Sequence, residues 1–270
     1  MPCETLNQKT VYHSVTLEHV YMMPHGDEIL ERSSQGGREI FRMSTSMGRN
    51  DKSDTIVIIS PHGLRLSGSI AVINTEYLHA DLLLKTLRIR RKYRTDRGMA
   101  GAILKADDLT QEAIFVTSSG PKSAFPLDFG SVIPLYFFGK KEVVAIGQPR
   151  IWNHGRLISF GRNLARVAME SRRKVSILIS ADQAHTHSAS GPYGYSADSE
   201  KYENMVEQCI TASDLSPLVT IKREIVENAK PDSYWNMIIL KGIMDETGLK
   251  PVLDYHYVED YFGMMLAHLS

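Results

Sequence analysis

The stretch DTIVIISPHG, residues 54–63, sets the expected fold class of this chain. Its apolar run, residues 56–59, does not alternate with polar residues, which is typical of a strand buried on both faces. Strands of that kind belong to parallel sheets that are covered by helices on both sides. The run leads into Pro-His-Gly at residues 61–63. The same tripeptide stands at residues 24–26, directly after the apolar segment LEHVYMM. Two apolar segments therefore each place a histidine beside a glycine turn.

Segments of strand and helix character alternate along the rest of the chain. This alternation predicts an α/β fold, in which residues 1–270 form a single three-layer domain with a mostly parallel central sheet flanked by helices. A small helical insertion is expected around residues 79–110. The sequence patterns predict strands within residues 11–24, 54–63, 68–77, 111–119, 130–138, 142–150, 174–185, 251–258 and 260–269, and helices within residues 37–49, 79–93, 154–173, 200–211, 219–229 and 233–244.

Composition narrows the classes of partner. Lys plus Arg equal Asp plus Glu at 31 each, so the chain has no excess charge that would favour nucleic acid or an anionic membrane surface. The basic run at residues 88–97 is interpreted as a solvated helix face, with anion binding as the alternative. The longest apolar runs are too short or too interrupted to span a bilayer. Only two cysteines and an N-terminal segment without an apolar signal region lead us to expect a cytoplasmic protein.

Histidines follow three of the expected strands. His25 and His62 stand in the two Pro-His-Gly turns, and His185 and His187 follow the apolar strand at residues 176–180. Ligand sites of open α/β sheets gather at the carboxyl ends of strands, and a glycine lets the backbone turn sharply there. Two neutral imidazoles at neighbouring strand ends are suitable ligands for a divalent metal. The alternative is that each histidine is a hydrogen-bonded structural residue.

A carboxylate would complete such a metal site. Iron or zinc bound by two histidines commonly takes a carboxylate as the third ligand, which leaves other coordination positions open. The segment ENAKPDSYWNM offers Glu227 and Asp232. Asp232 follows a proline and precedes an apolar helix, so N-capping of that helix is its alternative role.

The polar loop at residues 180–203 also points to a site. Its Gly-Pro-Tyr-Gly-Tyr turn carries aromatic residues that a flexible linker would lack, which indicates a pocket wall that includes Tyr193. Packing of these tyrosines is the alternative. His185 is a candidate acid–base group over a metal. For His187 the sequence leaves open a role as ligand, as partner of a ligand, as substrate contact or as an exposed residue.

Taken together, these segments resemble the class III extradiol ring-cleavage dioxygenase superfamily, of the protocatechuate 4,5-dioxygenase beta-subunit type. The resemblance runs from about residue 15 to the C-terminus and rests on five segments in the same order, MPHGDEI, IISPHG, the loop at residues 180–203, PDSYWNMIILKGIM and YFGMMLAHL. It implies that His25 and His62 are metal ligands and that His185 is the acid–base residue. Asp232 stands where the family places its third ligand, which is usually Glu, and Glu227 is the alternative.

The resemblance also implies a cofactor, a reaction and partners. Fe(II) would be the metal, with zinc as the alternative, and the partners would be a small aromatic substrate of the catechol type and O2. His185 would accept a catechol proton and later return one, and the ring would open next to the diol. Phe129, Tyr193 and His187 would contact the substrate. Members of the family often form homo-oligomers, and we expect one here.

One segment departs from the family pattern. PLDFGSVIPLYFF, residues 126–138, is similar to a family segment that reads Asp-His-Gly, so Phe129 stands where the family has a histidine beside the substrate. Phe cannot donate the hydrogen bond that this histidine donates.

Three alternatives follow from the same residues. The superfamily fold also occurs in the Memo family, so the chain is alternatively a metal-binding or partner-binding protein without ring-cleaving activity. A zinc or manganese hydrolase, in which His185 shuttles a proton from a metal-bound water, is the second alternative. The third is an α/β protein with structural histidines, which would bind no stoichiometric metal.

Overall fold

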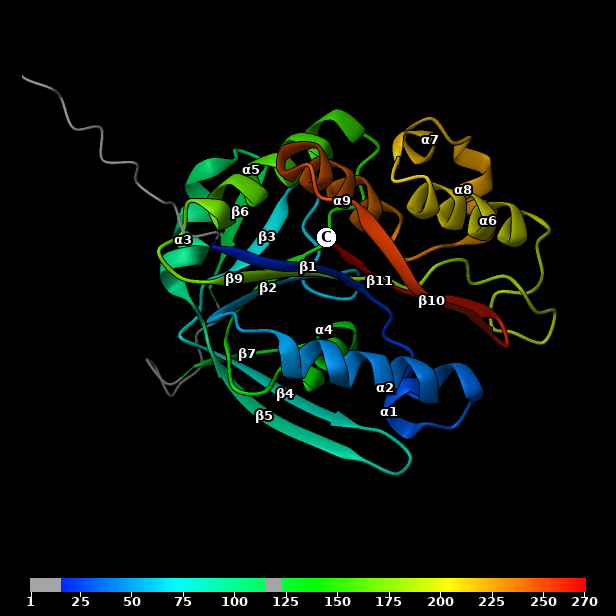
Figure 1. Ribbon diagram of the computed structural model, residues 1–270, viewed down its shortest axis with the longest axis horizontal. Helices are drawn as coiled ribbons and strands as arrows, with labels where there is room; N and C mark the ends of the chain where they lie inside the picture. Colours follow the sequence, from blue (N-terminus) through cyan, green and yellow to red (C-terminus); the bar gives the residue numbers. More distant parts are fainter. Residues whose placement is uncertain (1–15, 115–122) are drawn as a thin grey trace, which may run out of the picture.

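A large mixed sheet crosses the middle of the molecule and is seen nearly edge-on in Figure 1, which shows the computed structural model of the chain. The structure describes residues 16–114 and 123–270. The eight strands of the sheet lie in the order β10 (Pro251–Glu259), β11 (Phe262–Leu269), β1 (Leu17–Met23), β9 (Val175–Ser180), β2 (Thr55–Ser60), β8 (Glu142–Gly147), β3 (Ile70–Ile73) and β6 (Thr110–Ala113).

The centre of this sheet is parallel. Strand β9 pairs in parallel with β1 on one side and with β2 on the other, and β2 pairs in parallel with β8. Every residue of β2 and β9 is buried, as the unalternating apolar runs predict. The margins differ, because β11 is antiparallel to β1 and β10, and β3 is antiparallel to β8. The predicted α/β class is confirmed, with a sheet that is mixed at its margins and parallel at its centre.

Alternate residues of the central strands face two separate cores. Val57 and Ile59 of β2 pack in the core on one face of the sheet, whereas Ile56 and Ile58 pack in the core on the opposite face. Helices α5 (His154–Met169) and α9 (Tyr234–Thr247) contribute to the first core. The second face is covered by helix α2 (Gln35–Asn50), helix α4 (Phe129–Leu135) and a small sheet of the strands β5 (Arg88–Arg94), β4 (Tyr77–Leu83) and β7 (Ala124–Pro126) (Figure 1).

The remaining elements are short or lie beside the main layers. These are α1 (Asp27–Glu31), α3 (Arg97–Ala106), the 3-10 helix η2 (Tyr136–Phe138), α6 (Asp198–Thr211), α7 (Ser216–Val219) and α8 (Arg223–Ala229). Across residues 16–114 and 123–270, no helix combines the length and the apolar character needed to cross a membrane.

The helix predicted within residues 79–93 is wrong, because this segment forms the β4–β5 hairpin. In β5 the side chains of Ile89 and Tyr93 are buried while Arg88, Arg90 and Lys92 are exposed, which is the two-residue period of a strand. The basic run is therefore a strand face and not a helix face. Of the insertion expected around residues 79–110, only α3 is helical.

The strand predicted within residues 130–138 is also wrong, because α4 and η2 occupy it. Asp128 caps α4, since its Oδ1 atom accepts a hydrogen bond of 2.9 Å from the backbone N–H of Ser131. A capping carboxylate thus outweighs the β-branched and aromatic composition of the segment. The other predicted segments form elements of the predicted type where the structure describes them, and residues 11–15 and 115–119 lie outside the described ranges.

A buried carboxylate, Asp51, ties α2 to the central strands. Its Oδ1 atom lies 2.9 Å from the Lys141 ammonium and accepts from the Ser53 backbone N–H at 3.0 Å, and the Ser176 hydroxyl of β9 donates to its Oδ2 atom. Burial raises the pKa of Asp51, but the hydrogen bonds from Ser176, Ser53 and Lys141 outweigh burial and hold the pKa below its ordinary value. The carboxylate therefore stays charged inside the fold.

We expect Asp51→Asn to lower the free energy of unfolding by about 3 kcal/mol, because it leaves the largely buried Lys141 ammonium without its charged partner. Since the folded-state pKa is lowered, the stabilisation is present above the unfolded-state pKa of about 4 and is lost as pH falls through the folded-state value. The difference in the free energy of unfolding between wild type and Asp51→Asn should therefore shrink below about pH 4. Urea unfolding across a pH series measures it.

Asp108→Asn is the matched control. Asp108 pairs with Arg156 at 2.5 Å, but its side chain is 92% exposed, so its loss should cost about 0.5 kcal/mol or less. Equal losses in the two variants, or a loss in Asp51→Asn that does not change with pH, would contradict the assignment of Asp51.

Candidate metal centre

The candidate residues lie at the carboxyl ends of the three central strands. His25 follows β1, Asp182 and His185 follow β9, and His62 follows β2. Because these strands are parallel neighbours, the segments that leave them meet at one edge of the sheet. Asp232 comes from a different direction, from the turn that precedes α9.

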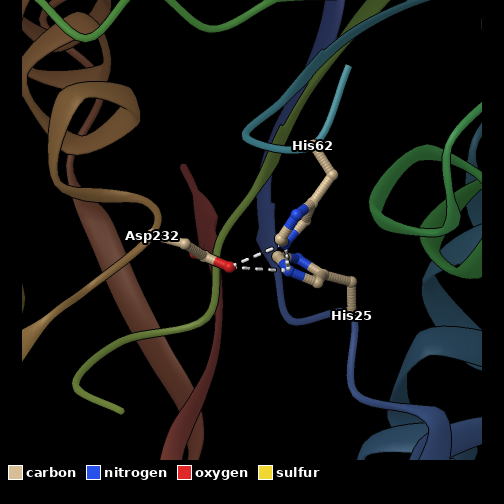
Figure 2. Close-up of side chains that lie close together, drawn as sticks. All are labelled: His25, His62 and Asp232. Carbon is tan, nitrogen blue, oxygen red and sulfur yellow. Dashed lines mark hydrogen bonds and ion pairs between the residues drawn. The ribbon is translucent and has the colours of Figure 1, made fainter. Parts of the chain in front are cut away.

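Three side-chain atoms converge at this edge (Figure 2). The Nε2 atoms of His25 and His62 are 3.1 Å apart, and they lie 3.1 and 2.9 Å from Oδ2 of Asp232. Neighbouring ligands of a six-coordinate ion with bonds of about 2.1 Å are about 3.0 Å apart. The spacing of the three atoms therefore matches one triangular face of such a site, which would leave its other positions open.

A serine of β9 determines which nitrogen of His25 is free. The Ser180 hydroxyl donates to the carbonyl of Gly130 at 2.6 Å, and its oxygen lies 2.9 Å from Nδ1 of His25. With its only proton engaged, the hydroxyl must accept from Nδ1–H of His25, so the neutral ring presents the lone pair of Nε2 to His62 and Asp232. This is the arrangement that orients a ligating histidine.

His185 is held in the same way by its own loop. Its Nδ1–H donates to the carbonyl of Gln183 at 2.7 Å, which leaves Nε2 without a proton in the neutral ring. That Nε2 atom lies 3.9 Å from Oδ2 of Asp232. The backbone N–H of His185 also donates to the carbonyl of Ala229 at 2.7 Å, which anchors the loop. A proton-accepting nitrogen therefore stands beside the three converging atoms.

Asp182 is a second buried carboxylate at the site, and the sequence analysis gave it no role. Its Oδ1 atom accepts from the backbone N–H of His25 at 2.9 Å, and its Oδ2 atom lies 3.4 Å from Nε2 of His25. Asp182 follows β9 as His62 follows β2. This position directly after a buried strand is the sequence feature that could have identified Asp182 as a site residue. Asp182, His185 and Asp232 also form a second group with the composition of a metal site.

Charged groups lie close together at this edge. Burial raises the pKa of Asp182 to about 6, with Asp232 acting in the same direction and His25 against it. Burial alone would lower the pKa of His25, but Asp182 and Asp232 raise it to about 9. Asp232 keeps a lowered pKa despite burial because His25 and His62 face it. A divalent cation would compensate the negative charges of Asp182 and Asp232, and it would take the place of the protons that otherwise compensate them.

The side chain of Asp232 faces the two histidines and does not cap helix α9. The cap residue of α9 is Ser233, and Asp232 makes no capping bond, so the N-capping interpretation is wrong. Its second oxygen, Oδ1, is buried and has no hydrogen-bond partner among the described residues. Glu227, the alternative third ligand, instead pairs with Arg223 at 2.6 Å on α8. The donor set at this edge thus fits a metal with Asp232 as its oxygen ligand.

A cavity of about 380 Å³ opens onto these atoms. The ring of Phe129 forms part of its wall and lies 4.2 Å from the ring of His62 between centroids, and Tyr193 lines the cavity beside His185. His187 does not line it, and its Nε2 lies 3.4 Å from a carboxylate oxygen of Glu203. Lining residues that the sequence analysis did not identify are Gly26, Asp27, Glu28, Leu82, Leu83, Leu84, Tyr261 and Phe262.

Two histidines at strand ends and a carboxylate from the turn before α9 converge on one cavity, which defines a candidate metal centre of the facial-triad type. The family model described as the catalytic LigB subunit of aromatic ring-opening dioxygenase matches residues 13–267. The chain belongs to this family, as the class III extradiol resemblance implied.

Two individual proteins are similar to the chain over most of its length. A curated protein of Clostridium acetobutylicum, Protein CA_C1420, is 22% identical over 93% of this chain, and the chain spans 56% of that protein. The crystal structure of the uncharacterized protein JW3007 from Escherichia coli K12 matches 94% of this chain and all of its own, with a TM-score of 0.63 and 14% identity. At that identity the likeness supports the fold alone.

We expect Ser180→Ala to weaken metal binding by about 10- to 100-fold, because the ring of His25 loses the partner that fixes its tautomer. Competition with a chelator, using Fe(II) under anaerobic conditions or Zn(II), measures the affinity. Ser176→Ala is the matched control, since Ser176 lies on the same strand but bonds to Asp51. Unchanged affinity in Ser180→Ala, or the same loss in both variants, would argue against this role.

Proposed function

We propose that this protein is a metal-dependent dioxygenase, loaded with Fe(II), that opens a catechol-type aromatic ring next to the diol with O2. The convergence of His25, His62 and Asp232 within 2.9–3.1 Å of one another, beside an aromatic-walled cavity, is the observation that carries the proposal. In this proposal these three residues hold the ion. Family membership supports the class of reaction. When bound, the iron supplies Lewis acidity toward the diol and a redox route between the ring and O2.

His185 is proposed to move the proton. Its Nδ1–H is engaged by the carbonyl of Gln183, so the neutral ring has a free Nε2 that can accept a proton from a catechol hydroxyl in the cavity that His185 lines. The ring of Phe262 stacks against His185 with centroids 5.7 Å apart and planes 19° apart, which restricts rotation of the imidazole. The same nitrogen can return the proton to the product.

Aromatic side chains are proposed to place the substrate ring. Phe129 lies over His62, Tyr193 and Phe262 lie near His185, and all three aromatic residues line the cavity. A flat catechol fits between such walls, with its hydroxyl groups directed to the histidines. Phe129 donates no hydrogen bond, so proton transfer at the site falls to His185 in this proposal.

The decisive experiment is oxygen uptake by protein that has been loaded with Fe(II) under anaerobic conditions and then mixed with a panel of catechols. We expect uptake together with a ring-opened product. His185→Gln should lower kcat by about 10²- to 10⁴-fold while the iron content stays unchanged, because only the proton acceptor is lost. His187→Gln is the matched control and should keep wild-type kcat, since His187 does not line the cavity.

A second candidate function is metal binding without ring cleavage, and the absence of a hydrogen-bond donor at Phe129 favours it. Stoichiometric iron with no oxygen uptake on any catechol would reject the dioxygenase proposal in favour of this one. Hydrolysis by the zinc-loaded protein, lost in His185→Gln, would instead indicate the hydrolase alternative.

A further inference from the structure

A cavity of about 880 Å³ lies at the end of the central sheet opposite to the candidate metal centre. Its walls include Asp54 and Lys141, which directly precede β2 and β8, and Arg173, which stands two residues before β9. Because β2, β8 and β9 are parallel, their amino ends meet at one edge of the sheet and their carboxyl ends at the other. This cavity shares no lining residue with the cavity at the metal centre.

The walls of this cavity are strongly basic. Seven lining side chains are cationic, of which four come from β5, two from the turn between η2 and β8, and one from the turn before β9. The lining carboxylates are Asp54 and Glu142. The whole chain has 31 Lys plus Arg and 31 Asp plus Glu, so this excess of positive charge is local. A local excess of one charge around a hollow attracts ligands of the opposite charge.

Neighbouring carboxylates neutralise part of this charge. Four of the cations form close ion pairs, which are Arg90–Asp81, Arg94–Glu142, Lys141–Asp51, Arg173–Glu142 and Arg173–Asp96. Within residues 16–114 and 123–270, no carboxylate lies within ion-pair distance of Arg91, Lys92 or Lys140. These three cations are therefore available to an anion from solution.

Tyrosine residues hold two of these three side chains in place. Arg91 donates to the carbonyl of Tyr136 at 2.8 Å, and its guanidinium lies 4.6 Å from the centroid of the same tyrosine's ring. The ammonium of Lys92 lies 3.6 Å from the centroid of the Tyr77 ring. Such contacts limit the orientations of a cationic side chain without neutralising its charge. Less conformational entropy is then lost when an anion binds.

The arrangement of the cations favours a compact ligand with several anionic groups. The cavity has a volume within the range of about 300–1,000 Å³ that is typical of small-molecule sites. Because β5 is the outer strand of the small sheet, side chains from both of its faces reach the cavity, and Lys140 faces them from a different segment. A guanidinium binds two oxygens of a phosphate group in parallel, and a lysine binds phosphate as a point charge.

We propose that this cavity is a binding site for a small molecule that carries several phosphate groups, and that Arg91, Lys92 and Lys140 bind its phosphate oxygens. Anion binding by the basic run at residues 88–97, the alternative that the sequence left open, thereby acquires a place in the fold. The site goes beyond the proposed function and does not rest on it, because the two cavities have no lining residue in common.

Calorimetric titration of inorganic tripolyphosphate into the full chain tests the proposal. The protein is kept metal-free, because polyphosphates also bind divalent cations. We expect saturable binding at one site per chain, about tenfold or more tighter than the binding of orthophosphate and weakened by added salt. In the Lys92→Gln/Lys140→Gln double variant the affinity should fall about tenfold or more, because two charged hydrogen-bond donors are lost.

Two further variants separate a site from a general effect of charge. Lys222→Gln/Lys250→Gln is the matched control, since it removes two exposed lysines that do not line the cavity and should bind as wild type does. Arg91→Lys keeps the charge of Arg91 without the planar fork and should lose part of the affinity. Because Lys92 and Lys140 are exposed, their double variant should unfold at the wild-type urea concentration, so lost binding would not reflect a folding defect.

Four outcomes would overturn the proposal. No saturable binding of tripolyphosphate by the wild type would reject the site, and equal losses in the two double variants would show that only net charge matters. Binding of citrate as tight as that of tripolyphosphate would reject phosphate as the recognised group. Tighter binding of a single-stranded oligothymidylate than of tripolyphosphate, lost in Lys92→Gln/Lys140→Gln, would replace the small ligand by nucleic acid.

Discussion

The parallel pairing of β9 with β1 and β2 is the constraint on which the rest of the structure depends. Parallel strands end at the same edge, so the segments that follow them must meet there, and this brings His25, Asp182 and His62 together. The pairing is stable only when both faces of the strands are covered, and the two cores provide that cover. The site is therefore a consequence of the same burial that stabilises the sheet.

Burial also explains why the site favours a cation. Asp182 and Asp232 lie within a few ångströms of His25 in a region with little water, and their mutual repulsion must be compensated by protons or by a metal ion. The hydroxyl of Ser180 orients the ring of His25, because its hydrogen bond to Nδ1 turns the free nitrogen of His25 toward Asp232. At the proposed metal site, charge would set the affinity, and the hydrogen bonds around the ligands would set the geometry.

Much of the fold and part of the site could be predicted from local patterns. The apolar runs of β2 and β9 and the doubled Pro-His-Gly identified the buried strands and the histidine pair, because a strand buried on both faces is apolar without alternation. The β4–β5 hairpin was missed because arginines and apolar residues at mixed spacing satisfy a helical period as well as an alternating one. Helix α4 was missed because the cap at Asp128, a single residue, outweighed the strand propensity of the residues after it.

The sequence by itself determined the α/β class, the two histidines at the strand ends and the family to which the chain belongs. Only the tertiary structure distinguishes Asp232 from Glu227, since Oδ2 of Asp232 lies beside the two histidines whereas Glu227 pairs with Arg223 on α8. The tertiary structure also brought Asp182 to the site. The physical reason is that a metal centre and its cavities are built from groups far apart in the chain, and a local pattern carries no information about distances between such groups.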